Sequence, residues 1–245
     1  LQYFQLEFHQ RWEIDAERIR AVCGARTRAV AVVNPNNPTG SFVSLREQES
    51  LAAAGLPIIA DEVFLDYPLD GSGASIVRDD VPVFALGGLS KSAGLPHFKL
   101  GWIRAGGPAK GEALDALETI ADNFLSVAMP VQAALPAILA IAPRIRAAIT
   151  ARTRRNLEAA RAVLAPVPSG QLLPVEGGWS AVICFPRVIS DEDFALELLE
   201  RGVAVQPGYF FDFPTDGHLV VSLLTAEETF SAGLARVAEA LGRLA

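Results

Sequence analysis

Four short apolar runs in the first half of the chain constrain its fold more than any other feature of the sequence. They cover residues 28–33, 57–60, 83–86 and 100–104. Each run is apolar nearly throughout rather than alternating, which is typical of strands buried on both faces. The stretches between the runs leave room for crossover connections. The pattern therefore predicts an α/β fold, with a mainly parallel sheet covered by helices on both faces.

Helical patterns lie between and after these strands. Ser44 is expected to begin a helix that runs to about Ala54, with Glu47 completing a capping box. Residues 110–125 and 131–164 also have apolar residues at helical spacing. The chain therefore supplies helices that can flank the predicted sheet.

The C-terminal part of the chain has a different character. Pro143 is expected to break the long helical stretch, and residues 166–170 have the composition of a linker. Strands are predicted over 179–185, 203–205 and 218–224, and helices over 191–201 and 226–244. We therefore expect a partial large domain over residues 1–142 and a smaller C-terminal α+β domain over residues 143–245.

The charge balance bears on the partners of the protein. Among its 245 residues, 21 are Lys or Arg and 28 are Asp or Glu, which gives a net charge of −7. This balance does not suit a protein whose main partner is nucleic acid, and the sequence contains no basic run. Hydrophobic residues make up 51% and charged residues 20%, so the chain can bury a core and is not disordered.

The cysteines and the N-terminal residues bear on the compartment. Cys23 and Cys184 lie far apart in the sequence, which indicates a reducing compartment without a disulfide framework. Residues 1–11 mix charged and apolar side chains and do not resemble a signal peptide. We therefore expect a cytoplasmic protein. Because the chain begins with Leu1 and its single methionine is Met129, we also expect that the start of a longer protein is missing.

One uncharged stretch, residues 123–143, is long enough to span a bilayer. Polar residues and prolines interrupt it, and its flanks lack a clear positive bias. We expect the start of a buried helix in a soluble protein rather than a membrane span.

Three of the four predicted strands end in polar residues that a strand does not require. They are Asn34–Gly40, the pair Asp61–Glu62 and the pair Ser90–Lys91. Taken singly, each is explained by turn chemistry, capping or solvation. In open parallel sheets, however, ligands bind at the carboxyl ends of the strands, so the three groups would converge on one pocket.

The three residue types have a chemistry in common. A lysine removed from water can act as an amine nucleophile and form a Schiff base. An aspartate opposite it could hold a proton on a heteroaromatic ring, and an asparagine could donate a hydrogen bond to a ring oxygen. Together these needs describe pyridoxal phosphate, an electron sink whose pyridinium is held by an acid.

In order and spacing, these residues resemble the fold-type-I pyridoxal-phosphate aminotransferases of class I/II. The matching segments are Val33–Gly40 (VNPNNPTG), Ala60–Phe64 (ADEVF) and Ser90–Trp102 (SKSAGLPHFKLGW), with Trp12–Asp15 and Ser126–Gln132 as further landmarks. The resemblance runs from about Trp12 to the end of the chain. It implies an incomplete large domain of the pyridoxal-phosphate transferase type, a smaller C-terminal domain, and a cofactor held between them.

The resemblance also implies a role for each matching residue. Lys91 would form the Schiff base with the cofactor and later move the substrate proton. Asp61 would pair with the pyridinium nitrogen, and Asn37 would donate to the ring hydroxyl, with a cis peptide bond to the proline that follows it. Ser90 and Lys99 would face the cofactor phosphate. No metal site is implied.

The chain departs from the family pattern at four places. Phe64 stands where the family usually has Tyr, so one hydrogen bond to the ring hydroxyl is lost. Lys99 replaces an Arg that forks onto the phosphate, and a lysine is not an equivalent replacement. Gly88 replaces a common Ser. Val220 stands where the family usually has the Arg that clamps the substrate carboxylate.

Two residues are candidates to replace the missing carboxylate clamp. They are Arg104 and His218, although a solvated arginine and a structural histidine are the simpler interpretations. The aromatic run Tyr209–Phe211 either lines a substrate pocket or belongs to ordinary packing.

The resemblance predicts an aminotransferase that exchanges an amino group between an amino acid and a 2-oxo acid, and that is a homodimer in the full-length protein. Three alternatives stay open: another pyridoxal-phosphate reaction such as that of a lyase or decarboxylase, a regulator that senses the cofactor without turning it over, and a non-catalytic remnant. The missing start would hold the glycine-rich turn that cups the phosphate. The 245-residue chain would then carry only part of the site.

Overall fold

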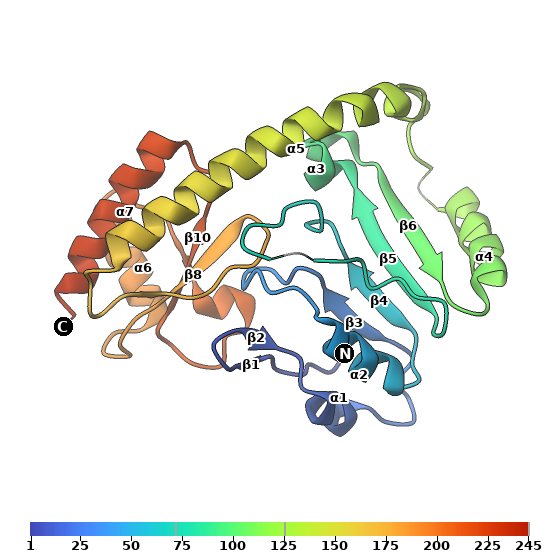
Figure 1. Cartoon of the computed structure of the whole chain (residues 1–245), viewed down its shortest axis with the longest axis horizontal. Coiled ribbons are helices and arrows are strands. Elements are labelled where there is room, and N and C mark those ends of the chain that lie inside the picture. Colours follow the sequence, from blue (N-terminus) through green and yellow to red (C-terminus); the bar gives the residue numbers. More distant parts are fainter. Residues whose placement is uncertain (72, 125, 245) are drawn as a thin grey trace.

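The computed structural model describes residues 1–71, 73–124 and 126–244 (Figure 1). It contains two four-stranded sheets and one two-stranded hairpin. The hairpin strands are β1 (Glu7–Phe8) and β2 (Trp12–Glu13). One long helix lies along both four-stranded sheets and connects them.

The first sheet has the strand order β3-β4-β5-β6. Its strands are β3 (Val30–Val33), β4 (Ile58–Asp61), β5 (Val83–Gly88) and β6 (Gly101–Gly106). β3, β4 and β5 run parallel and β6 runs antiparallel to β5, which confirms the prediction of a mainly parallel sheet. β6 enters the sheet at the end where β5 leaves it. The connecting helices, α3 (Leu89–Ser92) and η1 (Pro96–Phe98), are too short to carry the chain back along the sheet.

Within the described residues, helices cover only one face of the first sheet. α1 (Ala16–Val22) and α2 (Leu45–Ala53) lie on that face. The buried cluster between these helices and the sheet includes Ile19, Val30, Val32, Val43, Leu51, Ile58, Ala60, Val83 and Ala85. On the opposite face, Ile59 and Ile103 are 38% and 42% exposed. The prediction of cover on both faces is therefore wrong for this chain, because the two helices that flank β3 pack on the same side.

The local signal that starts α2 is confirmed. Glu47 N donates to Ser44 Oγ, and Ser44 N donates to the Glu47 carboxylate at 2.7 Å, so the capping box is complete. Glu47 is buried, and its other carboxylate oxygen accepts from Ile14 N at 2.7 Å. The start of α2 thereby also fixes the segment that follows the hairpin.

The second sheet is antiparallel, with the order β7-β8-β10-β9. Its strands are β7 (Gln171–Leu172), β8 (Ser180–Cys184), β10 (His218–Ser222) and β9 (Gln206–Pro207), and η2 (Gly208–Phe211) follows β9. α6 (Asp191–Glu200) and α7 (Glu227–Gly242) cover one face around a core that includes Ile183, Phe194, Leu219 and Leu241. This is the α+β unit that the sequence predicts.

The strand predicted over 203–205 is not formed. Gly202, with φ of +73°, ends α6, and Val203 N then donates back to Leu198 O at 2.9 Å. The backbone amide that a strand would use therefore closes the helix instead. Pairing starts one residue after the predicted strand, at β9.

α5 (Met129–Leu164) is a single helix of 36 residues that continues through Pro136 and Pro143. The prediction that Pro143 breaks it is wrong. A proline removes one N–H and crowds one carbonyl, and the exposed side of α5 lets water reach the freed groups. The predicted boundary between residues 142 and 143 falls inside this helix and stays a prediction. α4 (Lys110–Asn123) matches its predicted helix, whose expected end at residue 125 lies outside the described residues.

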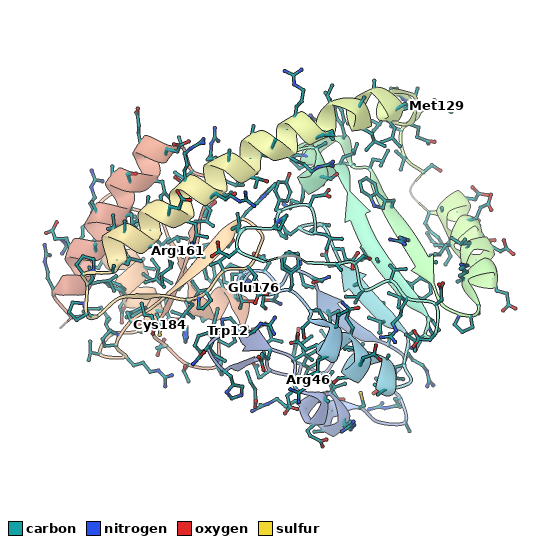
Figure 2. All side chains as sticks on the ribbon, viewed as in Figure 1. Trp12, Arg46, Met129, Arg161, Glu176 and Cys184 are labelled. Atoms are coloured by element: carbon teal, nitrogen blue, oxygen red, sulfur yellow. The ribbon has the colours of Figure 1, made fainter. Side chains whose placement is uncertain are left out.

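The first half of α5 is largely exposed rather than buried. Ile138 and Ala142 pack on α3. Met129, the first residue of α5, is labelled in Figure 2 and is 73% exposed. Among the described helices, α5 alone is long and apolar enough to cross a membrane by length and composition, and only 11% of its most apolar window is buried. One such helix is weak evidence for a membrane span. The expectation of a buried helix start is wrong, because within the described residues Ile138 and Ala142 are the only residues in the first half of α5 that are buried, against a small cluster that includes Leu89 and Leu100.

Glu176 ties the two halves of the chain together through its side chain and its backbone. Its carboxylate accepts from Arg11 Nε at 2.9 Å and from Phe42 N at 2.8 Å. Its carbonyl accepts from the three amides of residues 69–71. The hydrogen bond with Glu176 raises the pKa of Arg11, which keeps this pair ionised. In Figure 2, Glu176 and Trp12, the neighbour of Arg11, lie between the two sheets.

The backbone crossing beside Glu176 leaves no room for a side chain. Gly177 N donates to Gly40 O at 2.9 Å, and a Cβ on Gly40 would lie 2.6 Å from Gly177 O. Gly40 also has a left-handed φ of +72°. Gly55 has nearly the same φ, +66°, but a Cβ there would have no neighbour within 4 Å.

We predict that Gly40→Ala lowers the free energy of unfolding more than Gly55→Ala does. Both substitutions carry the cost of a left-handed alanine, roughly 1–2 kcal/mol. Only Gly40→Ala also pushes the second half of the chain away from the first. Chemical denaturation of the two variants measures the difference, and equal losses would contradict the tight crossing.

Candidate active site

The carboxyl ends of β3, β4 and β5 lie side by side. Asn34 N, just after β3, donates to Asp61 O at 2.8 Å. Glu62 N, just after β4, donates to Leu86 O in β5 at 3.0 Å. The polar segments that were expected to converge therefore follow adjacent strand ends.

Lys91 lies in α3, three residues after the end of β5. Its Nζ lies 5.4 Å from the centre of the Phe64 ring and 5.3 Å from that of the Trp179 ring. Among the described residues, no carboxylate pairs with Lys91, whereas Lys110 pairs with Asp79 at 3.7 Å. An amine held against two aromatic rings is well placed to attack a carbonyl group that enters beside it.

Tyr67 anchors the turn that carries Lys91. The Tyr67 hydroxyl donates a hydrogen bond to the backbone carbonyl of Lys91, and the tyrosine is fully buried. Burial raises the pKa of Tyr67 to about 12, so the hydroxyl keeps its proton and remains a donor. The position of Lys91 is therefore set from outside α3, which is itself only four residues long.

Asp61, the last residue of β4, is half-buried and keeps one carboxylate oxygen available. Its Oδ1 accepts from Val63 N at 3.1 Å, and Oδ2 meets no donor among the described residues. In the sheet register Asp61 pairs with Val33 and Leu86. It lies on the face opposite α1 and α2, because the buried Ala60 before it points toward them.

The asparagines of the Asn-rich turn have different surroundings. Asn34 is fully buried and satisfied: it donates to Ala74 O and accepts from Val43 N, both at 3.0 Å. Asn37 is exposed, and its Oδ1 lies 3.4 Å from Ser180 Oγ, which leaves its amide N–H groups available. The cis peptide bond after Asn37 is confirmed, and a second one, after Asn34, was not predicted.

The two residues expected at the phosphate differ in exposure. Ser90 is half-buried in α3, and Lys99 is exposed at the end of η1, with a left-handed φ of +50°. Neither side chain makes a contact with a described residue that would indicate where a phosphate binds. Their roles stay predictions.

Sequence reasoning missed Trp179, which stands directly before β8. Its ring lies 5.3 Å from the Phe64 ring and 4.9 Å from the Tyr67 ring, both edge-on. Its Nε1 is buried and has no acceptor among the described residues. The signal was present in the sequence, because the pair Gly177–Gly178 before a tryptophan marks a close backbone approach that places a large ring against another element.

The face of the second sheet that turns toward the site is apolar at Val220. Ser180 and Ser222 are paired in register, and Ser180 reaches Asn37, so this face is the one directed at the first sheet. Val220, two residues from Ser222, shares that face and is 2% exposed. It packs in a cluster with Leu173, Val182, Trp12, Cys184, Phe211 and Phe213. Of the aromatic run, Phe211 joins this packing, while Tyr209 and Phe210 are 46% and 61% exposed.

Arg104 does not reach the Asp61 side of the sheet. Arg104 pairs with Ala85, whereas Asp61 pairs with Leu86. Because paired residues share a face and successive residues alternate, Arg104 and Asp61 lie on opposite faces. Arg104 is exposed, as a solvated arginine would be.

His218 is a structural residue. Its ring stacks on Phe213 with the centroids 4.4 Å apart, and its Nδ1 lies 3.1 Å from Thr215 O. Burial lowers the pKa of His218 below its usual value of 6.5, so the ring is neutral at pH 7. A neutral imidazole cannot replace a guanidinium as a carboxylate clamp.

Comparison with known proteins agrees with this geometry. A family model described as aminotransferase class I and II matches residues 1–232. The chain belongs to the class I and II aminotransferase family. Tyrosine aminotransferase from Bos taurus is 28% identical over 229 residues, which cover 86% of this chain and 51% of that protein. An S-alkyl-thiohydroximate lyase from Arabidopsis thaliana is 38% identical over 151 residues, covering 56% of this chain and 32% of that protein.

Solved structures of the family share the fold. Alanine aminotransferase from Pyrococcus furiosus matches with a TM-score of 0.86 and 23% identity, covering 98% of this chain and 64% of that chain. The match confirms the α/β fold with a partial large domain. The chain spans about half the length of tyrosine aminotransferases.

The site residues fit pyridoxal phosphate, the cofactor of the class I and II aminotransferases. Within residues 1–71, 73–124 and 126–244, Lys91 has no carboxylate partner and Asp61 Oδ2 has no donor, while Asn37 offers amide protons. The buried indole N–H of Trp179 is a further donor that lacks an acceptor among the described residues. A polar heteroaromatic ring with oxygen substituents would satisfy all four groups.

We predict that His218 makes the folded chain less stable as the pH falls. Its pKa is lower in the folded state than in the unfolded state, so stability is full above about pH 6.5 and declines below it, as protonation favours unfolding. The variant His218→Phe keeps a ring against Phe213 and should flatten this decline. Urea denaturation between pH 5 and pH 8, values that bracket the usual histidine pKa, measures the slopes. Parallel slopes in the two proteins would exclude His218 as the cause.

Proposed function

We propose that the chain is part of a pyridoxal-phosphate-dependent aminotransferase that exchanges an amino group between an amino acid and a 2-oxo acid. The observation that carries this proposal is the position of Lys91. Its amine lies beside the Phe64 and Trp179 rings, three residues after β5, and β5 pairs with β4, whose last residue is Asp61. The similarity to tyrosine aminotransferase supports the same reaction class.

Each polar residue of the site then has a proposed role toward the cofactor or the substrate. When bound, pyridoxal phosphate supplies an electron sink for a substrate carbanion. Lys91 Nζ would bind the cofactor through its carbonyl carbon and would move a proton at the substrate carbon. Asp61 Oδ2 would hold a proton on the ring nitrogen, and Asn37 would donate to the ring oxygen. Ser90 and Lys99 are proposed to face the phosphate.

The walls of the site come from both sheets. Trp179 and Ser180 approach from the second sheet, and Lys91, Asp61 and Asn37 come from the first. The Phe64 and Trp179 rings meet edge-on and cover one side of the Lys91 amine. A reaction at this amine is therefore shielded on its aromatic side.

A second candidate is a lyase reaction on the same cofactor. Two observations favour it: the apolar packing at Val220, where the resemblance implies an arginine, and the 38% identity to a lyase. Product analysis separates the two reactions. Beyond one equivalent per site, an aminotransferase forms its 2-oxo acid only while an acceptor 2-oxo acid takes up the amino group, and a lyase needs no acceptor.

The remaining expectations, on location and partners, are also proposals. A cytoplasmic location agrees with two cysteines, Cys23 and Cys184, that are free thiols in the structure. Membership of the class I and II aminotransferase family supports the proposal of small-molecule substrates, an amino acid and a 2-oxo acid. A homodimer of the full-length protein is proposed by analogy with that family. Nucleic acid and membrane partners are not proposed.

We predict that Lys91 alone is labelled when the chain is treated with pyridoxal phosphate and reduced with borohydride. The chain has three lysines, Lys91, Lys99 and Lys110, so peptide mass mapping assigns the adduct without ambiguity. Lys91→Arg should lose the label. Lys110→Arg, at an exposed lysine paired with Asp79, should keep it. A folded chain that carries no adduct, or equal adducts on all three lysines, would count against the proposed site.

We also predict that Phe64→Tyr strengthens cofactor binding. A hydroxyl there adds a donor to the ring oxygen and adjoins Lys91, with an expected gain of about 1 kcal/mol or roughly a five-fold lower Kd. Titration of tryptophan fluorescence with pyridoxal phosphate measures the Kd. Phe210→Tyr, at a ring that is 61% exposed, is the matched control and should change nothing. A weaker-binding Phe64→Tyr variant would show that the ring oxygen lies elsewhere.

A further inference from the structure

Lys91 is held at both of its ends, at its amine and at its backbone carbonyl. The amine lies 5.3 Å from the centre of the Trp179 ring, within the range at which an ammonium group is attracted to an aromatic face. The carbonyl accepts a hydrogen bond from the hydroxyl of Tyr67, which is fully buried. The position of the amine therefore depends on two contacts that come from outside α3.

These two contacts meet at the indole of Trp179. Its ring packs against the Tyr67 ring with the centroids 4.9 Å apart, and against the Phe64 ring at 5.3 Å. Phe64 is also the second ring beside the amine, with its centre 5.4 Å from Lys91 Nζ. A displacement of the indole would thus reach Lys91 directly, through Phe64 and through Tyr67.

The indole makes these contacts with its ring and not with its N–H group. Trp179 Nε1 is buried and has no acceptor among the described residues. The Tyr67 and Phe64 rings meet the indole at steep angles, 68° and 73°. Edge-on aromatic pairs are directional and contribute beyond the area that they bury. The indole ring therefore holds two neighbours in a fixed arrangement around the amine.

The backbone before Trp179 fixes the indole against the first half of the chain. Gly178 N donates to Tyr67 O at 2.9 Å, and Gly177 N donates to Gly40 O at 2.9 Å. A Cβ on Gly177 would lie 3.0 Å from Tyr67 O, so the two backbones are in close contact. The segment that carries the indole cannot slide past Tyr67 without breaking these hydrogen bonds.

We propose that Trp179 is a positioning residue for Lys91: its ring limits the lysine side chain to conformations in which the amine reaches a carbonyl carbon that enters the site. This inference rests on the proposed function, in which Lys91 reacts with pyridoxal phosphate. In that step the amine nitrogen bonds to the aldehyde carbon, both amine protons leave with the aldehyde oxygen as water, and a C=N bond remains. Correct placement of the amine raises the rate, because the reacting atoms must approach closely and in the right direction.

The rate of labelling at Lys91 tests the proposal, with Lys110 as a reference in the same chain. The 245-residue chain is mixed with pyridoxal phosphate, samples are reduced with borohydride at short intervals, and peptide mass mapping gives the adduct at each lysine. Trp179→Met fills the space with a flexible side chain that has no ring. It should slow labelling of Lys91 by about ten-fold, since a misplacement of about 1 Å can cost up to about 100-fold. Labelling of Lys110 should not change.

A conservative variant separates positioning from general damage to the fold. Trp179→Phe keeps an aromatic ring and loses the indole N–H, so it should restore most of the labelling rate at Lys91. Tyr67→Phe keeps its ring and loses the donor to the Lys91 carbonyl. It should slow Lys91 by about three-fold, because a single hydrogen bond contributes modestly. Circular dichroism checks that each variant is folded.

Trp102→Met is the matched control for the loss of an indole. Trp102 pairs with Gly87, whereas Ile103 pairs with Leu86, which pairs with Asp61. Because successive residues alternate between faces, Trp102 lies on the face opposite Asp61, and it is 42% exposed. Its replacement should leave the labelling rates of both lysines unchanged.

The outcomes distinguish this inference from the proposed function. Equal labelling rates at Lys91 and Lys110 in the unchanged chain would count against the proposed function itself. Preferential labelling of Lys91 that persists in a folded Trp179→Met chain would overturn the positioning role and leave the proposed function standing. If Trp179→Met does not fold, Trp179→Leu is the second variant without a ring, and an unchanged rate at Lys91 in that variant would overturn the role in the same way.

Discussion

Glu176 is the residue on which the arrangement of the two sheets depends. Its carboxylate binds Arg11 and the backbone of Phe42, and its carbonyl collects the three amides of residues 69–71. A single residue of the second half thus satisfies donors from three separate segments of the first. Trp179 follows three residues later, so the same attachment sets how closely the indole approaches the amine of Lys91. The contacts of Glu176 therefore position both the two sheets and the residues of the site.

Most of the secondary structure could be predicted because its signals are local. The capping box at Ser44, the apolar runs that became β3, β4 and β5, and the closing helix α7 each depend on neighbouring residues only. The errors concern tertiary context. Pro143 stays within a helix because α5 has an exposed side, and residues 203–205 lose their strand because Val203 N closes α6. The bare face of the first sheet could not be predicted, since apolar runs do not say whether a cover is present.

The site could be predicted in part for the same reason. Lys91, Asp61 and Asn37 follow strand ends, and sheet topology brings such ends together without knowledge of packing. The aromatic surroundings of the lysine were not predictable, because Trp179 lies 88 positions away in the sequence and arrives through the crossing at Gly177. His218 is excluded as a cationic clamp because burial lowers its pKa, and no sequence pattern indicates that burial.

α5 packs against α3, which bears Lys91, at one end and against the core of the second sheet at the other. At about 1.5 Å per residue, the helix is roughly 54 Å long. It therefore joins the turn that carries Lys91 to the core of the second sheet, where Leu157 and Leu164 are buried. The turn that carries Lys91 is thereby connected to the second sheet by a second route, which does not pass through Glu176.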